Sequence, residues 1–276
     1  MNYYCLIAGL PEIEIEDKKL AFNIADFKKE VRPQLSNEDA QLLDLFYMKF
    51  DNQNLLHYLK NKEAIFDERG NLLKEELTEC LQLISEDAPF NHTFFPAYFK
   101  TFVSEYKEFQ QMDMTDLQWE NRLTELYYRW AMNCSNKLIS FWFEFNLNLN
   151  NILTAYSCRK YQMDIEPVGG NEVAESIKTS SQRDFGLTGI LENLDLFQRL
   201  SDESDLFERE KKIDLLKWQW LDEQTFFNYF SIEKVFAYLL KLEIIERWVN
   251  LDPTEGEKIF RELIDNLKKT VVNNSN

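Results

Sequence analysis

Glycine and proline are so scarce in this chain that they limit the folds open to it. Among 276 residues there are only 7 Gly and 6 Pro, well below the averages of about 7% and 5% in globular proteins. Sheets need these residues in the tight turns between strands, whereas helices joined by short connections need few of them. We therefore expect an all-α fold, and the 45% share of hydrophobic residues supplies a core for it.

Apolar periodicity places the expected helices along the chain. They cover residues 18–31, 36–50, 72–84, 96–111, 116–144, 191–200, 204–227, 231–251 and 254–270. Residues 116–144 are expected to form one long amphipathic helix with an aromatic stripe. The opening segment YYCLIAGLP is too short for periodicity to distinguish a strand from a helix. Residues 167–189 are rich in Gly and Ser and are expected to form a mobile loop.

The charge balance is strongly acidic. Asp and Glu number 48 against 31 Lys and Arg, which gives a formal net charge of −17. A field of this sign repels polyanions, so we expect no nucleic acid partner and no binding to anionic lipid. The most apolar window, residues 138–157, contains Glu144 and four asparagines, which disfavour a transmembrane segment. The cysteines have no close spacing and no signal-like N-terminal pattern is present, so we expect a cytoplasmic protein.

Three stretches are alike when the starts of their expected helices are superimposed. They are FDNQNLLHYLK from Phe50, LNLNNILTAYS from Leu147 and FSIEKVFAYLL from Phe230. In each, a large apolar residue precedes a short polar residue that is able to cap a helix, and an apolar pair follows. The polar residues are Asp51, Asn148 and Ser231. The pattern predicts three corners between packed helices, with coincidence as the alternative, since caps precede apolar runs at every helix start.

These three stretches, the opening YYCLIAGLP and the segment FSIEKVFAYLLKLEIIERW together resemble the C subunit of V-type and A-type rotary ATPases, called d in eukaryotes. More closely, the chain is similar to a bacterial uncharacterised family thought to stand in for that subunit in some V-type ATPase operons. The similarity covers most of the chain loosely and is best from Phe230 to Trp248, where Ala237, Glu243 and Arg247 occur. The chain departs from the family at Ala8-Gly9-Leu10, where an arginine-containing motif is expected.

The resemblance implies a funnel-like arrangement of three similar helical subdomains, at about residues 1–95, 96–190 and 191–276. It also implies a non-catalytic central-stalk subunit that couples the rotating shaft to the membrane proteolipid ring during proton or sodium transport. The partners would be those other V-type ATPase subunits. The protein would be peripheral to the membrane, at the inner face of the cell membrane, and the resemblance assigns no contact residues.

The sequence contains no recognisable catalytic, cofactor-binding or metal-binding motif. The two histidines, His57 and His92, are far apart in sequence, and neither has a Glu at the spacing of a helical metal site. The pair Gly169-Gly170 lacks the Lys-Ser or Lys-Thr and the preceding strand of a phosphate-binding loop. Cys134 and Cys158 lie in aromatic helical segments and are interpreted as buried thiols. We therefore expect no cofactor, no metal and no enzyme activity.

Two other functions stay open at this point. A helical enzyme of an unrecognised class would use carboxylates such as Glu144 or Glu233 in a pocket. A helical protein-interaction adaptor would lack threefold internal symmetry. The acidic runs at residues 12–17 and 202–210 are interpreted as solvated faces. The aromatic residues between Trp218 and Phe230 are interpreted as core packing, with a docking surface as the alternative.

Overall fold

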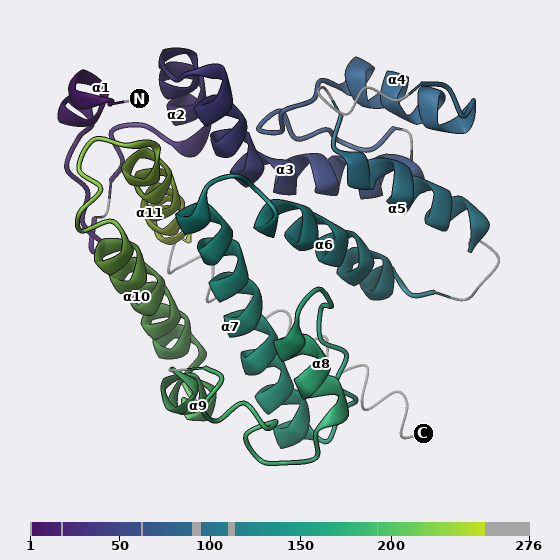
Figure 1. The fold of residues 1–276 in the computed structure, drawn as a ribbon, viewed down its shortest axis with the longest axis vertical. Coiled ribbons are helices and arrows are strands. Elements are labelled where there is room, and N and C mark those ends of the chain that lie inside the picture. Colours follow the sequence, from purple (N-terminus) through teal and green to yellow (C-terminus); the bar gives the residue numbers. More distant parts are fainter. Residues whose placement is uncertain are drawn as a thin grey trace. The chain divides into compact units, whose positions relative to one another are not determined.

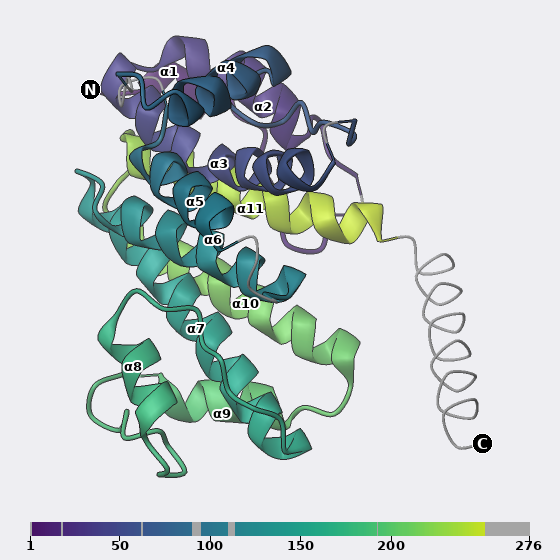
Figure 2. The same ribbon diagram turned by 90° about the vertical axis from the view of Figure 1, so that its right-hand side faces the viewer.

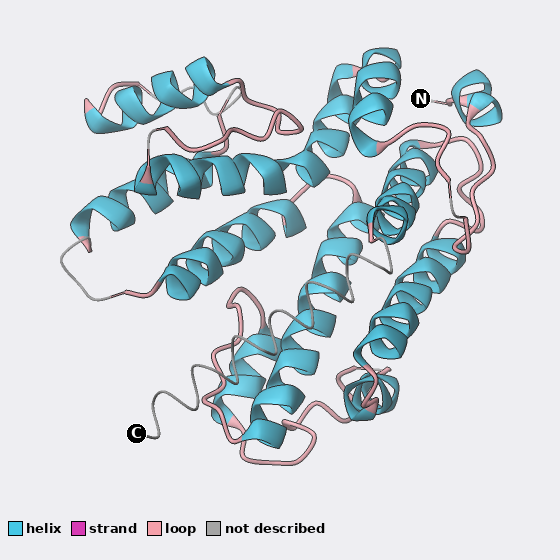
Figure 3. Ribbon diagram, turned by 180° about the vertical axis from the view of Figure 1, so that it is seen from behind, coloured by secondary structure: helices cyan, strands magenta, loops and turns pink. Residues whose placement is uncertain are grey.

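The computed structural model describes residues 2–17, 19–61, 63–89, 95–109, 114–191 and 193–251. These residues form eleven α-helices and one 3-10 helix and contain no strand (Figure 3). The predicted all-α class is therefore confirmed. The last predicted helix, residues 254–270, and His92 lie outside the described residues.

The helices follow one another along the chain (Figure 1). They are α1 (Tyr4–Gly9), α2 (Ile24–Val31), η1 (Arg32–Gln34), α3 (Asn37–Lys60), α4 (Lys74–Ser85), α5 (Ala97–Glu108), α6 (Asp116–Met132), α7 (Lys137–Tyr161), α8 (Glu172–Thr179), α9 (Leu194–Asp202), α10 (Leu206–Gln224) and α11 (Ile232–Asn250). Side-chain caps explain several starts, because Asn23, Ser36 and Thr115 each accept a hydrogen bond from the N–H three residues later. The predicted helix at residues 18–31 therefore begins only after Asn23.

The chain divides into two compact units. The first combines Met1–Leu35 with Asp214–Asn276, and the second contains Ser36–Ile213. In the first unit, α2 packs against α11. In the second, α6 contacts α3, α5 and α7, and α7 also contacts α8 and α9 (Figure 2). The three predicted subdomains, with boundaries near residues 95 and 190, stay a prediction.

The most apolar window of the sequence is a packed helix of the second unit. Residues 138–157 lie within α7, which contacts α6, α8 and α9. Two of its asparagines, Asn148 and Asn151, are buried. In the described part of the chain, no helix is both long enough and apolar enough to cross a membrane.

The prediction of a single helix over residues 116–144 is wrong, because the chain turns between α6 and α7. Asn136 accepts a hydrogen bond from the N–H of Ile139 at 3.2 Å and so caps α7. The Ser140 hydroxyl donates to the carbonyl oxygen of Met132, the last residue of α6, at 2.5 Å. The apolar pattern continues across this turn, so periodicity does not detect it, and the polar residues at 133–136 decide where the helices end.

The segment expected to be a mobile loop, residues 167–189, contains a helix. α8 starts after Asn171, whose side chain accepts a hydrogen bond from the N–H of Ala174 at 3.0 Å. Val173, Ala174 and Ile177 bury one side of α8. The segment is therefore not a loop throughout, and its mobility stays a prediction.

Two of the three predicted helix corners are wrong. Phe50 and Asp51 lie within α3, and Leu147 and Asn148 lie within α7, so neither polar residue caps a helix. Ser231 does precede α11, but its side chain makes no capping hydrogen bond. Asp51 and Asn148 are instead buried, and a buried polar group needs a hydrogen-bond partner.

The middle of α3 holds the loop that follows it. The Asp51 carboxylate accepts hydrogen bonds from the N–H groups of Asn71 and Leu72, at 2.8 and 3.0 Å. One turn along the helix, Asn54 Oδ1 accepts from Asp67 N at 2.7 Å, and Asn54 Nδ2 donates to Asp67 O at 2.9 Å. We call Asp51 and Asn54 the α3 clamp, because they fasten the loop that leads into α4.

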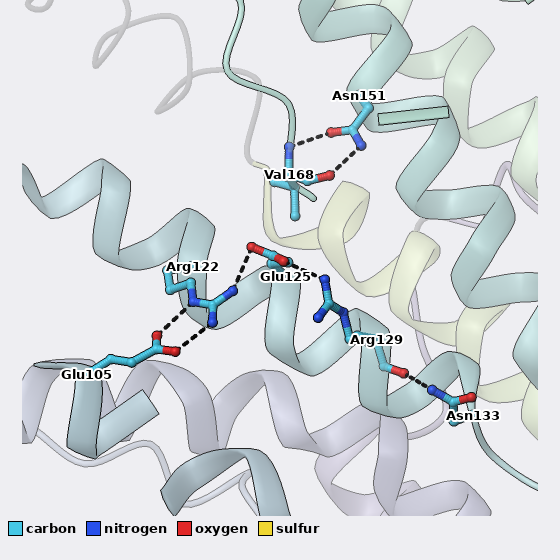
Figure 4. A network of polar contacts seen from close by, with 7 residues as sticks. All are labelled: Glu105, Arg122, Glu125, Arg129, Asn133, Asn151 and Val168. Atoms are coloured by element: carbon cyan, nitrogen blue, oxygen red, sulfur yellow. Dashed lines mark hydrogen bonds and ion pairs between the residues drawn. The ribbon is translucent and has the colours of Figure 1, made fainter. Parts of the chain in front are cut away.

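The middle of α7 holds its own following loop in the same way. Asn151 Oδ1 accepts from Val168 N at 2.9 Å, and Asn151 Nδ2 donates to Val168 O at 2.8 Å (Figure 4). One turn earlier, Asn148 Oδ1 accepts from the side-chain amide of Asn171 at 2.7 Å. We call Asn148 and Asn151 the α7 clamp. The likeness between the first two stretches is therefore a repeated side-chain clamp and not a repeated helix start.

Both clamped loops contain a Gly-Asn pair, Gly70-Asn71 and Gly170-Asn171. At Gly70 the backbone passes so close to the clamp that a Cβ would lie 2.4 Å from Asp51 Oδ1. In the third stretch, Ser231 and Lys234 occupy the places of the clamp residues, so the sequence pattern of the clamp is not repeated there.

Candidate protein-binding surface

The N-terminal segment is held against α11, although the two are far apart in sequence. Tyr3 N donates a hydrogen bond to Phe230 O at 2.7 Å, and the rings of Tyr4 and Phe230 lie 4.1 Å apart between centroids. Further along α11, the Tyr238 hydroxyl donates to Pro11 O at 2.9 Å. These contacts fix α1 and the residues after it on the first unit.

Five aromatic side chains are exposed where the α10–α11 turn meets α1. Tyr4, Phe226, Phe227, Tyr229 and Phe230 form this group, which we call the aromatic corner, and their exposed fractions are 54%, 60%, 83%, 59% and 37%. The ring centroids of Phe226 and Phe227 are 4.9 Å apart, and those of Tyr229 and Phe230 are 6.4 Å apart. The interpretation of residues 226–230 as core packing is therefore wrong.

The turn after α10 directs these side chains outward. Thr225 is buried, and its hydroxyl donates to Leu221 O at 2.6 Å. Asn228 N donates to Thr225 O at 3.0 Å and closes the turn. Thr225 is the residue of this turn whose side chain is buried, and the side chains of the aromatic residues that follow it are exposed on the surface. Trp218 and Trp220, on α10 itself, are half-buried.

A pocket of about 520 Å³ lies next to the aromatic corner within the first unit. Ile7, Leu10 and Ile13 of the N-terminal segment and Ala237 of α11 form its apolar wall. Tyr238 also lines it, and burial raises the pKa of Tyr238 to about 12. An apolar wall with a few polar groups is typical of pockets that take up a ligand or a side chain.

Charged side chains surround the same pocket. Lys234 and Lys241 line it from α11, and Glu12 and Glu14 line it from the N-terminal segment. Lys241 is largely buried and pairs with Asp222, whose Oδ1 lies 2.5 Å from Lys241 Nζ. Burial lowers the pKa of Lys241, and the hydrogen bond to Asp222 partly offsets this effect. The charge of Lys241 is thus balanced within the chain, whereas Glu12 and Glu14 are exposed to solvent.

The two segments that build the corner and most of the pocket are acidic. Residues 2–17 and 218–233 contain no Lys, Arg or His. Their carboxylates are Glu12, Glu14, Glu16, Asp17, Asp222, Glu223 and Glu233. Asp222 is paired with Lys241, and the excess of carboxylates over basic residues in these two segments sets a negative potential around them.

The residues considered for catalysis do not meet at this pocket. Glu144 is exposed on α7 in the second unit, and Glu233 lies in the first turn of α11. Neither residue lines the pocket. His57 is exposed on α3. Among the described residues, no group of three or more His, Cys, Asp or Glu is placed to hold a metal ion.

The glycine pair Gly169-Gly170 lies beside a carboxylate. A Cβ on Gly169 would lie 2.9 Å from Cδ of Glu125. Glu125 is held by Arg122 at 2.9 Å, and Arg122 also binds Glu105 through two hydrogen bonds of 2.6 and 2.7 Å (Figure 4). A carboxylate at this position would repel a phosphate group, which supports the interpretation of the glycines as part of a structural loop.

The predicted burial of Cys134 and Cys158 is only partial, because both are half-buried, whereas Cys80 is fully buried. The acidic run at residues 202–210 is mostly exposed, as interpreted, and its Glu203 pairs with Lys212.

Neither the aromatic corner nor the loop clamps follow from the helical pattern, although each has a signal in the sequence. FFNYF at residues 226–230 follows the end of α10 and lacks helical spacing, so its rings cannot all face one core. The clamps are marked by an Asp or Asn, then an Asn three residues later, then a Gly-Asn pair further on.

Comparison with protein families finds a match over nearly the whole chain. The family described as "Protein of unknown function (DUF2764)" matches residues 1–271. No curated protein and no solved structure matches the chain. The matched residues include the aromatic corner, the pocket and both clamps.

Proposed function

We propose, on the premise that this chain belongs to the DUF2764 family, that it is a non-catalytic central-stalk subunit of a V-type ATPase. In this role it seats the rotating shaft and couples it to the membrane proteolipid ring, and so takes part in the transport of protons or sodium. Its three similar helical subdomains form a funnel around the shaft. It works at the inner face of the cell membrane through contacts with the other subunits.

The contact between two segments that carry the resemblance is the main support for this proposal. The opening segment and the segment from Phe230 to Trp248 are far apart in sequence, yet the ring of Tyr4 in the first packs against that of Phe230 in the second, with centroids 4.1 Å apart. Both rings are exposed. Exposed aromatic side chains held by a fixed backbone suit a subunit whose work is to hold other proteins.

The loop clamps support the internal repetition that the proposal requires. In α3–α4 and again in α7–α8, a long helix is followed by a loop that contains a Gly-Asn pair and then by a shorter helix. In both, buried polar residues three apart on the long helix bind the loop. Two copies of one device fit a chain that is built from similar helical subdomains.

Affinity capture from native membranes tests the proposal directly. The chain, tagged at its C-terminus and expressed from its own locus, is captured after mild detergent extraction, and its partners are identified by mass spectrometry. We expect shaft and proteolipid subunits of a V-type ATPase in the captured complex. An unrelated membrane enzyme of similar abundance is the control for carry-over.

Deletion of the gene gives a functional test of the same proposal. Without a coupling subunit, membrane vesicles lose ATP-driven ion uptake, while the detached catalytic sector continues to hydrolyse ATP. Reintroduction of the intact chain restores the uptake. Unchanged ion uptake in the deletion strain, together with capture of the chain without ATPase subunits, would refute the proposal.

A helical adaptor is the second candidate, and the aromatic corner favours it as well. The same capture experiment separates the two, because an adaptor would bring down partners unconnected with ion transport. The enzyme alternative receives less support, since neither Glu144 nor Glu233 lines the pocket of the first unit.

A further inference from the structure

We infer that the aromatic corner and the adjoining pocket bind an α-helix of a partner protein, one with an apolar face flanked by Lys and Arg. This inference deepens the proposed function by giving a partner surface and its chemistry, and it rests on that function only for the identity of the partner. Its supports are the exposed rings, the pocket and the sign of the surrounding charge.

The exposed rings form two contacting groups, Phe226 with Phe227 and Tyr4 with Phe230 and Tyr229. Phe227 is 83% exposed and contacts Phe226, while Tyr4 packs against Phe230, which lies next to Tyr229. Single exposed apolar residues are common on proteins, but a cluster of aromatic rings is a mark of interaction surfaces. Such rings supply large contact areas with little loss of side-chain entropy, which makes them binding hot spots.

The pocket offers an anchor point next to these rings. α1 contributes both Tyr4 to the aromatic corner and Ile7 to the pocket, and residues three apart lie on the same side of a helix. On α11, the pocket is lined by residues 234, 237, 238 and 241, which share one face of the helix. A volume of about 520 Å³ admits a large apolar side chain of a partner while the neighbouring residues of the partner cover the rings.

The charges identify the partner as cationic. The segments 2–17 and 218–233 have no basic side chain. The pocket itself is lined by two lysines, Lys234 and Lys241, and Lys241 is already paired with Asp222. Glu12 and Glu14 at the pocket remain exposed, where they can pair with Lys or Arg of a partner. The same charges repel an anionic membrane and a second copy of this chain, whose net charge is −17.

The secondary structure favours a helix as the bound form. An extended peptide binds most readily by adding a strand to an exposed sheet edge, and the described residues contain no strand. An amphipathic helix instead places side chains three and four residues apart on one face. That spacing allows one side chain to enter the pocket while another contacts the aromatic corner.

A peptide-binding experiment with the full chain tests the inference. The probe is a fluorescent amphipathic helical peptide with Leu and Phe on one face and Lys and Arg on its flanks. Two control peptides have the same apolar face with Glu flanks, and the same composition in scrambled order. We expect binding of the basic peptide, at least tenfold weaker binding of both controls, and weaker binding at high salt.

Variants of the chain locate the bound peptide. Phe226→Ser with Phe227→Ser is expected to weaken binding of the basic peptide at least tenfold, and Glu12→Lys with Glu14→Lys is expected to do the same. The matched control is Phe141→Ser with Tyr161→Ser, which changes two exposed aromatic residues of α7 in the second unit and leaves the affinity unchanged. Circular dichroism before titration shows that each variant keeps its helix content.

Several outcomes would overturn the inference. It fails if the Phe226/Phe227 variant binds the basic peptide as tightly as the original chain, or if the peptide with Glu flanks binds equally well. It also fails if sedimentation shows a dimer that this variant abolishes, because the occupant is then a second copy. Binding to anionic lipid vesicles that this variant abolishes would assign the surface to a membrane and also overturn it.

The result is separable from the proposed function. If the Phe226/Phe227 variant still captures V-type ATPase subunits from membranes as the original does, the inference is wrong and the function stands. In the opposite case, the original chain captures no ATPase subunit, but it binds the basic peptide and the Phe226/Phe227 variant does not. The proposed function is then wrong and the inference stands.

Discussion

Asn151 and Val168 are joined by two hydrogen bonds that run in opposite directions between one side-chain amide and one backbone residue. Nδ2 donates to the carbonyl oxygen at 2.8 Å, and Oδ1 accepts from the N–H at 2.9 Å. Asn is the side chain of this length that offers both a donor and an acceptor. Asn54 makes the same two bonds with Asp67 in the first half of the second unit.

Replacement of Asn151 by Leu should destabilise the second unit. Leu has a similar volume but leaves the N–H and carbonyl of Val168 without their partner, so we expect a loss of about 2–4 kcal/mol in the free energy of unfolding. Asn54→Leu should have a similar effect through Asp67. The control is Asn150→Ala, at an exposed neighbouring position, with a change within about 0.5 kcal/mol. Urea unfolding followed by circular dichroism measures all three, and equal stabilities would contradict the clamp.

Replacement of Arg122 by Lys should show how much the paired hydrogen bonds from its guanidinium to Glu105 add to stability beyond a simple ion pair. Arg122 binds both oxygens of Glu105 and also reaches Glu125, whereas Lys cannot form the fork. We expect a loss of about 1 kcal/mol at low salt, smaller at 1 M salt because these side chains are partly exposed. Arg129→Lys, at a more exposed residue with one contact to Glu125, should have no measurable effect. Equal losses in the two variants would show that the fork adds nothing.

Asp214 should make the stability of the first unit depend on pH. Burial raises the pKa of its carboxyl above the ordinary value of 3.8, and Arg247 and Trp248 only partly oppose this effect. The folded state therefore keeps the proton to a higher pH than the unfolded state. The contribution of Asp214 to stability is then largest below pH 3.8, falls as pH rises through the raised pKa, and is constant above it.

The measurement compares the original chain with Asp214→Asn by urea unfolding between pH 3 and pH 7. The stability of the original chain minus that of the variant should decrease as the pH rises through this interval. A difference that increases with pH would mean that the ion pair with Arg247 outweighs burial. Glu144→Gln, at an exposed residue, is the control.

The cysteines should differ in their reaction with a thiol reagent. Cys80 is fully buried, and burial raises its pKa to about 12, so its thiolate is rare at neutral pH. Cys5 is exposed. In variants that retain one cysteine each, we expect Cys5 to react at least a hundredfold faster than Cys80 in the folded chain, and at a similar rate in urea. Rapid reaction of Cys80 in the folded chain would show that α4 opens readily.

The sequence predicted the helices where local chemistry sets their ends. Ser36 caps α3 and Thr115 caps α6, and both starts were expected. The break between α6 and α7 cannot be predicted from periodicity, because apolar residues keep a helical period across it and only the local signal at Asn136 marks it. α8 was missed because Gly and Ser flank a helix of only eight residues.

The candidate surface was harder to predict than the fold. Asp51 and Asn148 have the residue types of helix caps, and only the position of a loop some 20 residues later shows that they are clamp residues. Likewise, Phe226 and Phe227 have the side chains of core residues. Their exposure follows from the turn at Thr225, which buries its own side chain and turns the rings away.

The clamps on α3 and α7 also determine how these helices would carry a mechanical load. Each joins a shorter helix to the middle of a long one, so a pull on α4 or α8 is shared among several hydrogen bonds before it reaches the covalent connection. The clamp therefore ties the long helix and the shorter helix after it into one stiffer unit. Without the clamp, the loop between the two helices would bend more easily under load.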